Sequence, residues 1–220
     1  MERTLDFNTL KERQRLERGT HQPNLALRAH RALRWPNKAE QTEDDEGRFI
    51  FLWIAFNAAY ATEIDESSRL SEQETFKAFL GKLYDLDTQG RISGLVWNEF
   101  SGSIRVLLDN PFVFHSFWEF QRGRISAEDW QSRFETGKRS ANKALASGNP
   151  AEVLALVFNR IYVLRNQMMH GGATWNSQVN RDQLRDCARF LGKLVPLVIE
   201  IMLDNPNTLW GDACFPVVQA

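Results

Sequence analysis

The stretch FIFLWIAFNAAYA, residues 49–61, decides the fold class, because it is the most apolar segment of the chain. It is too short for a membrane span, which requires roughly 18 consecutive apolar residues. An apolar segment of this length is instead typical of a helix that is buried inside a globular domain. We therefore expect a central buried helix over residues 48–62 and no crossing of a membrane.

The segments on both sides of this helix carry apolar residues at three- and four-residue spacing, which is the periodicity of amphipathic helices. β-Branched runs bounded by hairpin signals such as Asn-Gly are missing from the sequence. The sequence therefore predicts an all-α protein, an up-and-down helical bundle with extra peripheral helices. Besides 48–62, the predicted helices cover 6–18, 25–35, 71–83, 126–146, 151–169 and 182–203, and the aromatic-rich stretch 92–122 is predicted to be helical but interrupted.

A length of 220 residues and a hydrophobic content of 43% fit one domain with a sizeable core. We expect residues 1–220 to form this domain, with 1–20 as a peripheral segment and 90–148 as a helical insertion between core helices. The tetrapeptide LDNP occurs at 108–111 and again at 203–206. We interpret both copies as helix stops, because Asn tolerates left-handed backbone geometry and Pro cannot continue a helix.

Two local patterns predict where helices begin and end. Pro36 disfavours helical geometry at the preceding residue, so we expect a helix to end at Trp35. The acidic run 40–46 that follows is predicted to be a solvated loop. Ser71 is followed three residues later by Glu74, which is the pattern of a capping box and predicts a helix start.

The charges are balanced, with 27 basic and 28 acidic residues and a net charge of -1, so any nucleic-acid site must be a local patch. Cys187 and Cys214 have neither metal-ligand nor redox spacing, and the chain opens without a signal segment, which predicts a cytoplasmic protein with reduced thiols. No zinc spacing, phosphate-binding glycine loop or nucleophile elbow is present, so we expect no metal and no cofactor.

The stretch RNQMMHGG, residues 165–172, places polar groups at the end of an otherwise apolar helix. Arg165 lies one step off the core stripe, so its guanidinium is partly desolvated and favours an anion or a carboxylate as partner. Asn166 and His170 are four residues apart, so the amide can fix the tautomer of the imidazole. Arg165 and His170 lie about 140° apart around an ideal helix. We expect either unwinding at residues 171–172 or, preferably, a second copy of the helix across a two-fold axis.

These groups suit the cleavage of RNA without a metal ion. Histidine titrates near neutral pH and can take the proton of a 2′-hydroxyl, while arginine can donate two hydrogen bonds to phosphate oxygens. General acid-base catalysis of this kind contributes about 10²–10⁴ in rate. The products would be a 2′,3′-cyclic phosphate and a 5′-hydroxyl.

The pattern Arg165-Asn166-x-x-x-His170 on a late helix resembles the ribonuclease motif of HEPN domains. RFIFLWIAFNAAYA (48–61) resembles the Trp-x-x-Phe-Asn-x-x-Tyr helix of the Apea-like HEPN branch, and RAHRALRWPNKAE (28–40) is similar to the helix that precedes it there. The resemblance implies a homodimer of helical bundles in which both motifs face one cleft. It also implies metal-independent RNA cleavage in defence, stress or toxin roles, with an antitoxin or defence protein as partner. By this resemblance, His170 is the base, Arg165 stabilises the phosphate, and Asn166 orients the other groups.

The same resemblance leaves alternatives open. Some HEPN toxins carry a tyrosine two residues after the histidine that a nucleotidyltransferase antitoxin modifies, and Gly172 at this position argues against such an antitoxin here. Other HEPN domains are non-catalytic modules for dimerisation, nucleotide binding or protein binding, and a purely structural helix end is a third possibility. Asn57 either lines the cleft and contacts RNA or bridges two helix backbones in the core, and Arg160 either holds a flanking phosphate or forms a surface ion pair. Of the other histidines, we expect His115 to be buried and His21 and His30 to lie at the surface.

Overall fold

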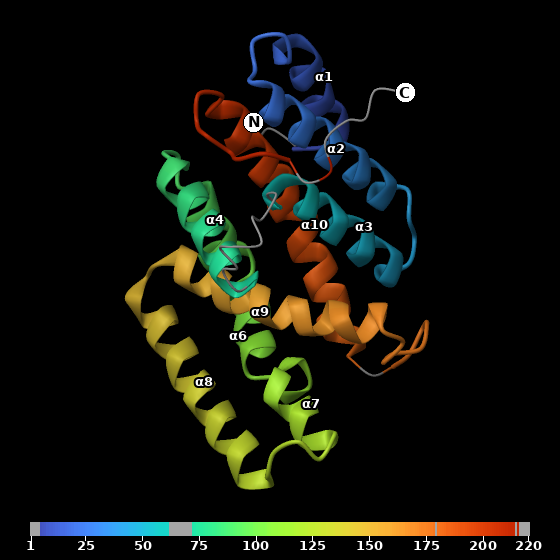
Figure 1. Cartoon of the computed structure of the whole chain (residues 1–220), viewed down its shortest axis with the longest axis vertical. Coiled ribbons are helices and arrows are strands. Elements are labelled where there is room, and N and C mark those ends of the chain that lie inside the picture. Colours follow the sequence, from blue (N-terminus) through green and yellow to red (C-terminus); the bar gives the residue numbers. More distant parts are fainter. Residues whose placement is uncertain (1–4, 62–71, 179, 214, 216–220) are drawn as a thin grey trace.

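The computed structural model describes residues 5–61, 72–178, 180–213 and 215, and it confirms the all-α class (Figure 1). No strand occurs in this part of the chain, and none of its helices is long and apolar enough to cross a membrane. The helical elements are α1 (Phe7–Glu17), α2 (Pro23–Glu40), α3 (Asp45–Tyr60), α4 (Glu72–Leu86), α5 (Arg91–Gly94), the π-helix η1 (Leu95–Glu99), α6 (Ser101–Leu108), the 3-10 helix η2 (Pro111–Val113), α7 (His115–Gln121), α8 (Ala127–Ser147), α9 (Pro150–Met169) and α10 (Arg181–Asp204).

The predicted central helix is α3, which packs against α2 on one side and α10 on the other (Figure 1). α9 packs against α4, and α6 and α8 also contact α9. Aromatic rings fill the junction of α3, α4 and α9, where the centroids of Phe56 and Phe158 are 4.3 Å apart. The segment 90–148 comprises α5 to α8 and contacts α9 and α10. Its status as an insertion stays a prediction.

The predicted helix end at Trp35 is wrong, because α2 continues through Pro36 to Glu40. A proline inside a helix removes one backbone hydrogen bond and costs about 3 kcal/mol or more. Here Pro36 is buried within the long contact between α2 and α3, and the ring of Trp35 stacks on Phe51 with centroids 5.9 Å apart. Tertiary packing along the whole of α2 therefore outweighs the local preference of the proline.

The acidic run is also only partly a loop. Asp44 caps α3 by accepting a hydrogen bond from the Gly47 N–H at 2.7 Å, and Asp45 and Glu46 form the first turn of the helix. Carboxylates are favourable at this end because the helix dipole places partial positive charge there. Only residues 41–44 connect α2 to α3.

Both predicted LDNP stops are confirmed, because α6 ends at Leu108 and α10 ends at Asp204. The predicted left-handed backbone is wrong, since φ is -85° at Asn110 and -124° at Asn205. Instead, each asparagine side chain forms a hydrogen bond with the backbone at the stop. Asn110 Oδ1 accepts a hydrogen bond from the Phe112 N–H, and Asn205 Nδ2 donates one to the Ile201 carbonyl. The predicted capping box begins at Ser71, which lies outside the described residues.

Candidate functional site at the C-terminal end of α9

The core stripe predicted on α9 is present. Asn149 caps the helix by accepting a hydrogen bond from the Ala151 N–H, and Pro150 occupies the first helical position, where its missing N–H costs nothing. The predicted stripe consists of Leu154, Val157, Ile161 and Leu164, which are buried, and Met168, which is half-buried against the core. Beside it, Phe158 and Tyr162 face α3, where both contact the ring of Trp53. This packing fixes the rotation of α9 and therefore the direction of the polar groups that follow.

α9 stays helical up to Met169 and ends with paired hydrogen bonds beyond it. His170 is the capping residue, and its N–H still donates to the Asn166 carbonyl at 3.1 Å. The Gly171 N–H donates to Met168, and the Gly172 N–H donates to Gln167 at 2.7 Å, which is the arrangement of a Schellman motif. The chain leaves the helix at residues 171–172, but His170 keeps its backbone hydrogen bond to Asn166, so the expected unwinding does not swing His170 round the helix.

Gly171 is required for this helix end. Its φ is +70°, in the left-handed region where a side chain is strained. We expect Gly171→Ala to lower the free energy of unfolding by about 1 kcal/mol, measured by urea denaturation. Gly81→Ala is the matched control, because Gly81 lies inside α4 with no atom within 4 Å of the position that a Cβ would take, and this change should stabilise the protein. Equal effects of the two substitutions would contradict the role of Gly171.

Arg165 is a half-buried cation whose only hydrogen bond in the described structure is to an uncharged group. Its Nη1 donates to Asn166 Oδ1 at 2.8 Å, while its Nε is buried and has no partner. Arg13, Arg91 and Arg181 instead all form ion pairs with carboxylates. The Arg165 guanidinium therefore retains donors for an anion. Asn166, expected to orient the imidazole of His170, binds Arg165 instead.

The imidazole of His170 is exposed, and it makes no hydrogen bond within the described part of the chain. Because α9 is regular up to Met169, Arg165 and His170 remain about 140° apart around the helix. One copy of the chain therefore does not bring both groups to the same atom.

Asn57 lies away from these residues. Phe56 packs on Phe158 and Trp53 packs on Tyr162, so α3 and α9 run in opposite directions along their contact. Asn57 therefore lies toward the start of α9, whereas Arg165 lies toward its end. The Asn57 Oδ1 is buried without a hydrogen-bond partner, so the predicted bridge between helix backbones is not formed through this oxygen.

Arg160 is buried and lies on another side of α9. Its Nη2 donates to the Leu108 carbonyl at 3.3 Å, and its guanidinium stacks on the ring of Phe114, 4.3 Å from the centroid. Burial without a carboxylate lowers the pKa of Arg160 to about 10. The expected surface ion pair is not formed, and the side chain is not placed to hold a phosphate beside Arg165.

Several residues near the motif were not predicted from the sequence, because their partners are distant in the chain. Gln167 donates to the Phe112 carbonyl at 2.6 Å and accepts a hydrogen bond from Asn180. Glu46 accepts a hydrogen bond from the Asn176 N–H and forms an ion pair with Arg181 at 3.0 Å. These contacts attach Asn176, Asn180 and Arg181, which follow the helix end, to α9 and to the first turn of α3. No local pattern carries a signal for them.

Large apolar side chains are exposed at this end of the molecule: Trp175 is 77% exposed, Met169 53% and Phe112 45%. The attachment of Phe112 to α9 through Gln167 brings η2 beside the helix end. Exposed aromatic and methionine side chains are enriched at protein interfaces.

The remaining histidines do not join the motif. The prediction for His115 is wrong, since its side chain is 71% exposed beside Glu119. The prediction for His21 is also wrong, since its side chain is 2% exposed beside Glu17. His30 is exposed, as expected.

Comparisons with known proteins add no relative: no family model, no curated protein and no solved structure matches the chain. The resemblance to HEPN domains therefore rests on the segments 28–40, 48–61 and 165–170. Among the described residues, His, Cys, Asp and Glu side chains form no group of three that could hold a metal ion.

Proposed function

We propose that the protein is a metal-independent endoribonuclease of the HEPN type, in which two subunits share one cleft. The observation that carries the proposal is the half-buried guanidinium of Arg165, which lacks a carboxylate partner among the described residues and lies at the same helix end as the exposed imidazole of His170. A desolvated cation with free donors is suited to a phosphate oxygen.

The reaction uses these groups as base and electrostatic stabiliser. His170 takes the proton from a ribose 2′-hydroxyl, and the 2′-oxygen attacks the adjacent phosphorus. The bond from phosphorus to the 5′-oxygen breaks, and that oxygen takes a proton from water. Arg165 donates to the phosphate oxygens, on which negative charge grows during the attack. The products are a 2′,3′-cyclic phosphate and a 5′-hydroxyl.

The two-subunit arrangement is favoured because α9 does not unwind before His170. A two-fold axis beside the helix end would bring His170 of one subunit toward Arg165 of the other. The exposed side chains of Met169, Trp175 and Phe112 supply apolar contact area for such an interface. We propose a defence, stress or toxin role for this activity, together with a protein partner. We also propose that the protein acts in the cytoplasm, because the buried free thiol of Cys187 fits a reducing compartment.

Mixing two inactive variants tests both the chemistry and the shared cleft. Arg165→Ala and His170→Ala are each expected to lose cleavage of an unstructured RNA in EDTA. A mixed dimer of the two variants retains one intact pair, Arg165 from one subunit and His170 from the other. We therefore expect mixing to restore activity, with 2′,3′-cyclic phosphate ends on the products.

The control for this experiment is each variant mixed with itself at the same total concentration, which should stay inactive. The proposal fails if the wild-type protein leaves tRNA and unstructured RNA intact in EDTA. If the wild type is active and mixing restores nothing, the two groups act within one chain and the shared cleft is wrong.

A second candidate function is a non-catalytic module that dimerises or binds a partner protein, favoured by the exposed Met169, Trp175 and Phe112. On this view, Met169→Lys should weaken the dimer in sedimentation equilibrium, and no RNA cleavage should be detectable in the wild type.

A further inference from the structure

The α7–α8 hairpin, formed by α7, α8 and the turn between them, projects at the end of the molecule opposite to α1 and α2 (Figure 1). It carries an aromatic cluster made of Phe117, Trp118, Phe120 and Trp130. Phe120 stacks on Trp130 with centroids 6.0 Å apart, and Phe117 contacts Trp118 and Trp130 edge to face. All four residues are half-buried, and none belongs to the main core of the described residues.

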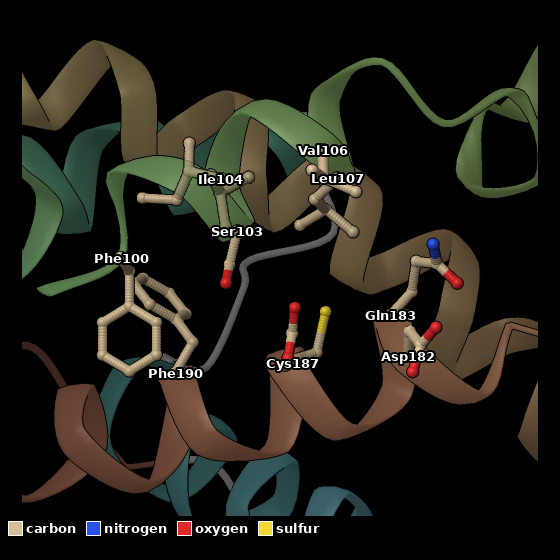
Figure 2. A pocket seen from close by; sticks show the side chains of 11 residues that line it. Phe100, Ser103, Ile104, Val106, Leu107, Asp182, Gln183, Cys187 and Phe190 are labelled. Atoms are coloured by element: carbon tan, nitrogen blue, oxygen red, sulfur yellow. The ribbon is translucent and has the colours of Figure 1, made fainter.

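The position of this cluster leaves its rings partly open to water. Phe100, from the same aromatic-rich stretch of the sequence, lies instead in the core, edge to face with Phe190 of α10 at 5.4 Å between centroids (Figure 2). Among the described elements, α7 packs mainly against α8 and η2, so no further helix covers the cluster. Aromatic faces that remain accessible are the platforms on which proteins stack the bases of single-stranded nucleic acids.

The hairpin is also a basic part of a slightly acidic chain. Residues 115–147 contain six basic and four acidic residues, whereas the whole chain contains 27 basic and 28 acidic residues. Three of the four carboxylates are occupied within the hairpin, by ion pairs or by the cap of α8. Four cations are exposed and form no ion pair within the described part of the chain: Arg122, Arg124, Arg139 and Lys143. This surplus of positive charge suits a phosphate backbone.

Hydrogen bonds place the hairpin beside the end of α9. The Phe112 carbonyl accepts two hydrogen bonds, one from the Trp118 indole N–H at 2.7 Å and one from the Gln167 side chain at 2.6 Å. Gln167 and His170 are three residues apart and are therefore neighbours on the surface of α9. Trp118 thus lies on the side of α9 that carries His170, and Arg122 and Arg124 follow it toward the tip of the hairpin.

We propose that the aromatic and basic face of the α7–α8 hairpin binds single-stranded RNA where the strand leaves the site at His170. This inference rests on the proposed function, because it names the surface that holds the substrate of that site. A base stacks on the open face of Trp118, and the guanidinium groups of Arg122 and Arg124 contact phosphates of the same strand. Bases inside a duplex are not free to stack on a ring, so the hairpin prefers single strands.

The arginines are tested by RNA binding in a His170→Ala background, which removes cleavage. The measurement is the fluorescence anisotropy of a labelled oligouridylate of about 12 nucleotides in EDTA. Arg122→Ala/Arg124→Ala should weaken binding about tenfold and lower the slope of log K against log salt concentration by about 1.4, since each phosphate contact of a single strand contributes about 0.7. Arg15→Ala/Arg18→Ala, at exposed positions of α1, is the charge-matched control and should change neither value.

Two substitutions separate the ring of Trp118 from its hydrogen bond. Trp118→Phe loses the bond to the Phe112 carbonyl but retains a ring, whereas Trp118→Leu loses both. We expect nearly unchanged binding for Trp118→Phe, and about tenfold weaker binding with an unchanged salt slope for Trp118→Leu. Circular dichroism checks the folding of both variants. If Trp118→Leu unfolds the hairpin, the exposed arginine variants still test the proposal.

The possible outcomes distinguish this inference from the proposed function. Unchanged binding in Arg122→Ala/Arg124→Ala would overturn the inference, as would equal binding of a duplex RNA of the same length. Dissociation of a wild-type dimer by these substitutions, with RNA binding unchanged, would assign the face to a second copy of the chain. If the hairpin binds RNA that the wild type leaves intact, cleavage is refuted and binding is not.

Discussion

The His170→Ala variant is expected to cleave RNA about 10²–10⁴ times more slowly than the wild type. The reason is that the imidazole is the proposed base for the 2′-hydroxyl, and no other described residue of this helix end replaces it. The measurement is the initial rate of cleavage of a fluorescently labelled unstructured RNA in EDTA. The protein concentration is chosen so that nearly all of the protein is dimeric.

The structure separates this effect from unfolding. The His170 side chain is exposed, and the helix end is held by backbone hydrogen bonds that alanine retains. We therefore expect the free energy of unfolding to change by less than about 0.5 kcal/mol. His30→Ala, at an exposed position of α2, is the matched control and should cleave at the wild-type rate. Wild-type activity of His170→Ala would refute the assigned base.

The Phe158→Ala variant is expected to lose about 3–5 kcal/mol of stability. Phe158 is 0% exposed, and its ring contacts rings from two other helices: Phe56 of α3 at 4.3 Å and Phe76 of α4 at 5.7 Å between centroids. Alanine would leave a cavity at the point where α3, α4 and α9 meet. The measurement is the midpoint and slope of urea denaturation followed by circular dichroism.

Leu16→Ala is the control for this prediction, because Leu16 is 80% exposed and should contribute less than about 0.5 kcal/mol. Since domains of this size are stable by only about 5–15 kcal/mol, the loss at Phe158 is a large part of the total. A loss below about 1 kcal/mol would mean that Phe158 is not a tightly packed part of the junction of α3, α4 and α9.

The predicted helices agree with the structure where the pattern is local. The apolar stripe of α9 and the stops at both LDNP copies depend on residues within one or two turns of each other, so a single sequence contains the whole signal. The failures at Pro36 and in the acidic run have different causes. At Pro36, the packing of α2 on α3 outweighs a local preference. In the acidic run the signal is itself local, because Asp44 caps α3 and the carboxylates of Asp45 and Glu46 are favourable in its first turn.

The motif was visible in the sequence, but its geometry was not. The spacing of Arg165, Asn166 and His170 depends only on the helical repeat, whereas the partner of each side chain depends on rotamers and neighbours. Asn166 pairs with Arg165 and not with His170. Arg160 stacks on Phe114, and Asn57 lies toward the opposite end of α9 because α3 and α9 are antiparallel.

The sequence by itself determined the helical class, the order of the main helices, the buried stripe of α9 and the presence of a polar group of residues at its end. Only the tertiary structure decided which of these polar residues are exposed, which are buried, and which partners they bond. The physical reason is the separation of the interacting residues along the chain. Helical periodicity depends on residues a few positions apart, whereas burial and charge pairing depend on residues far apart in the chain.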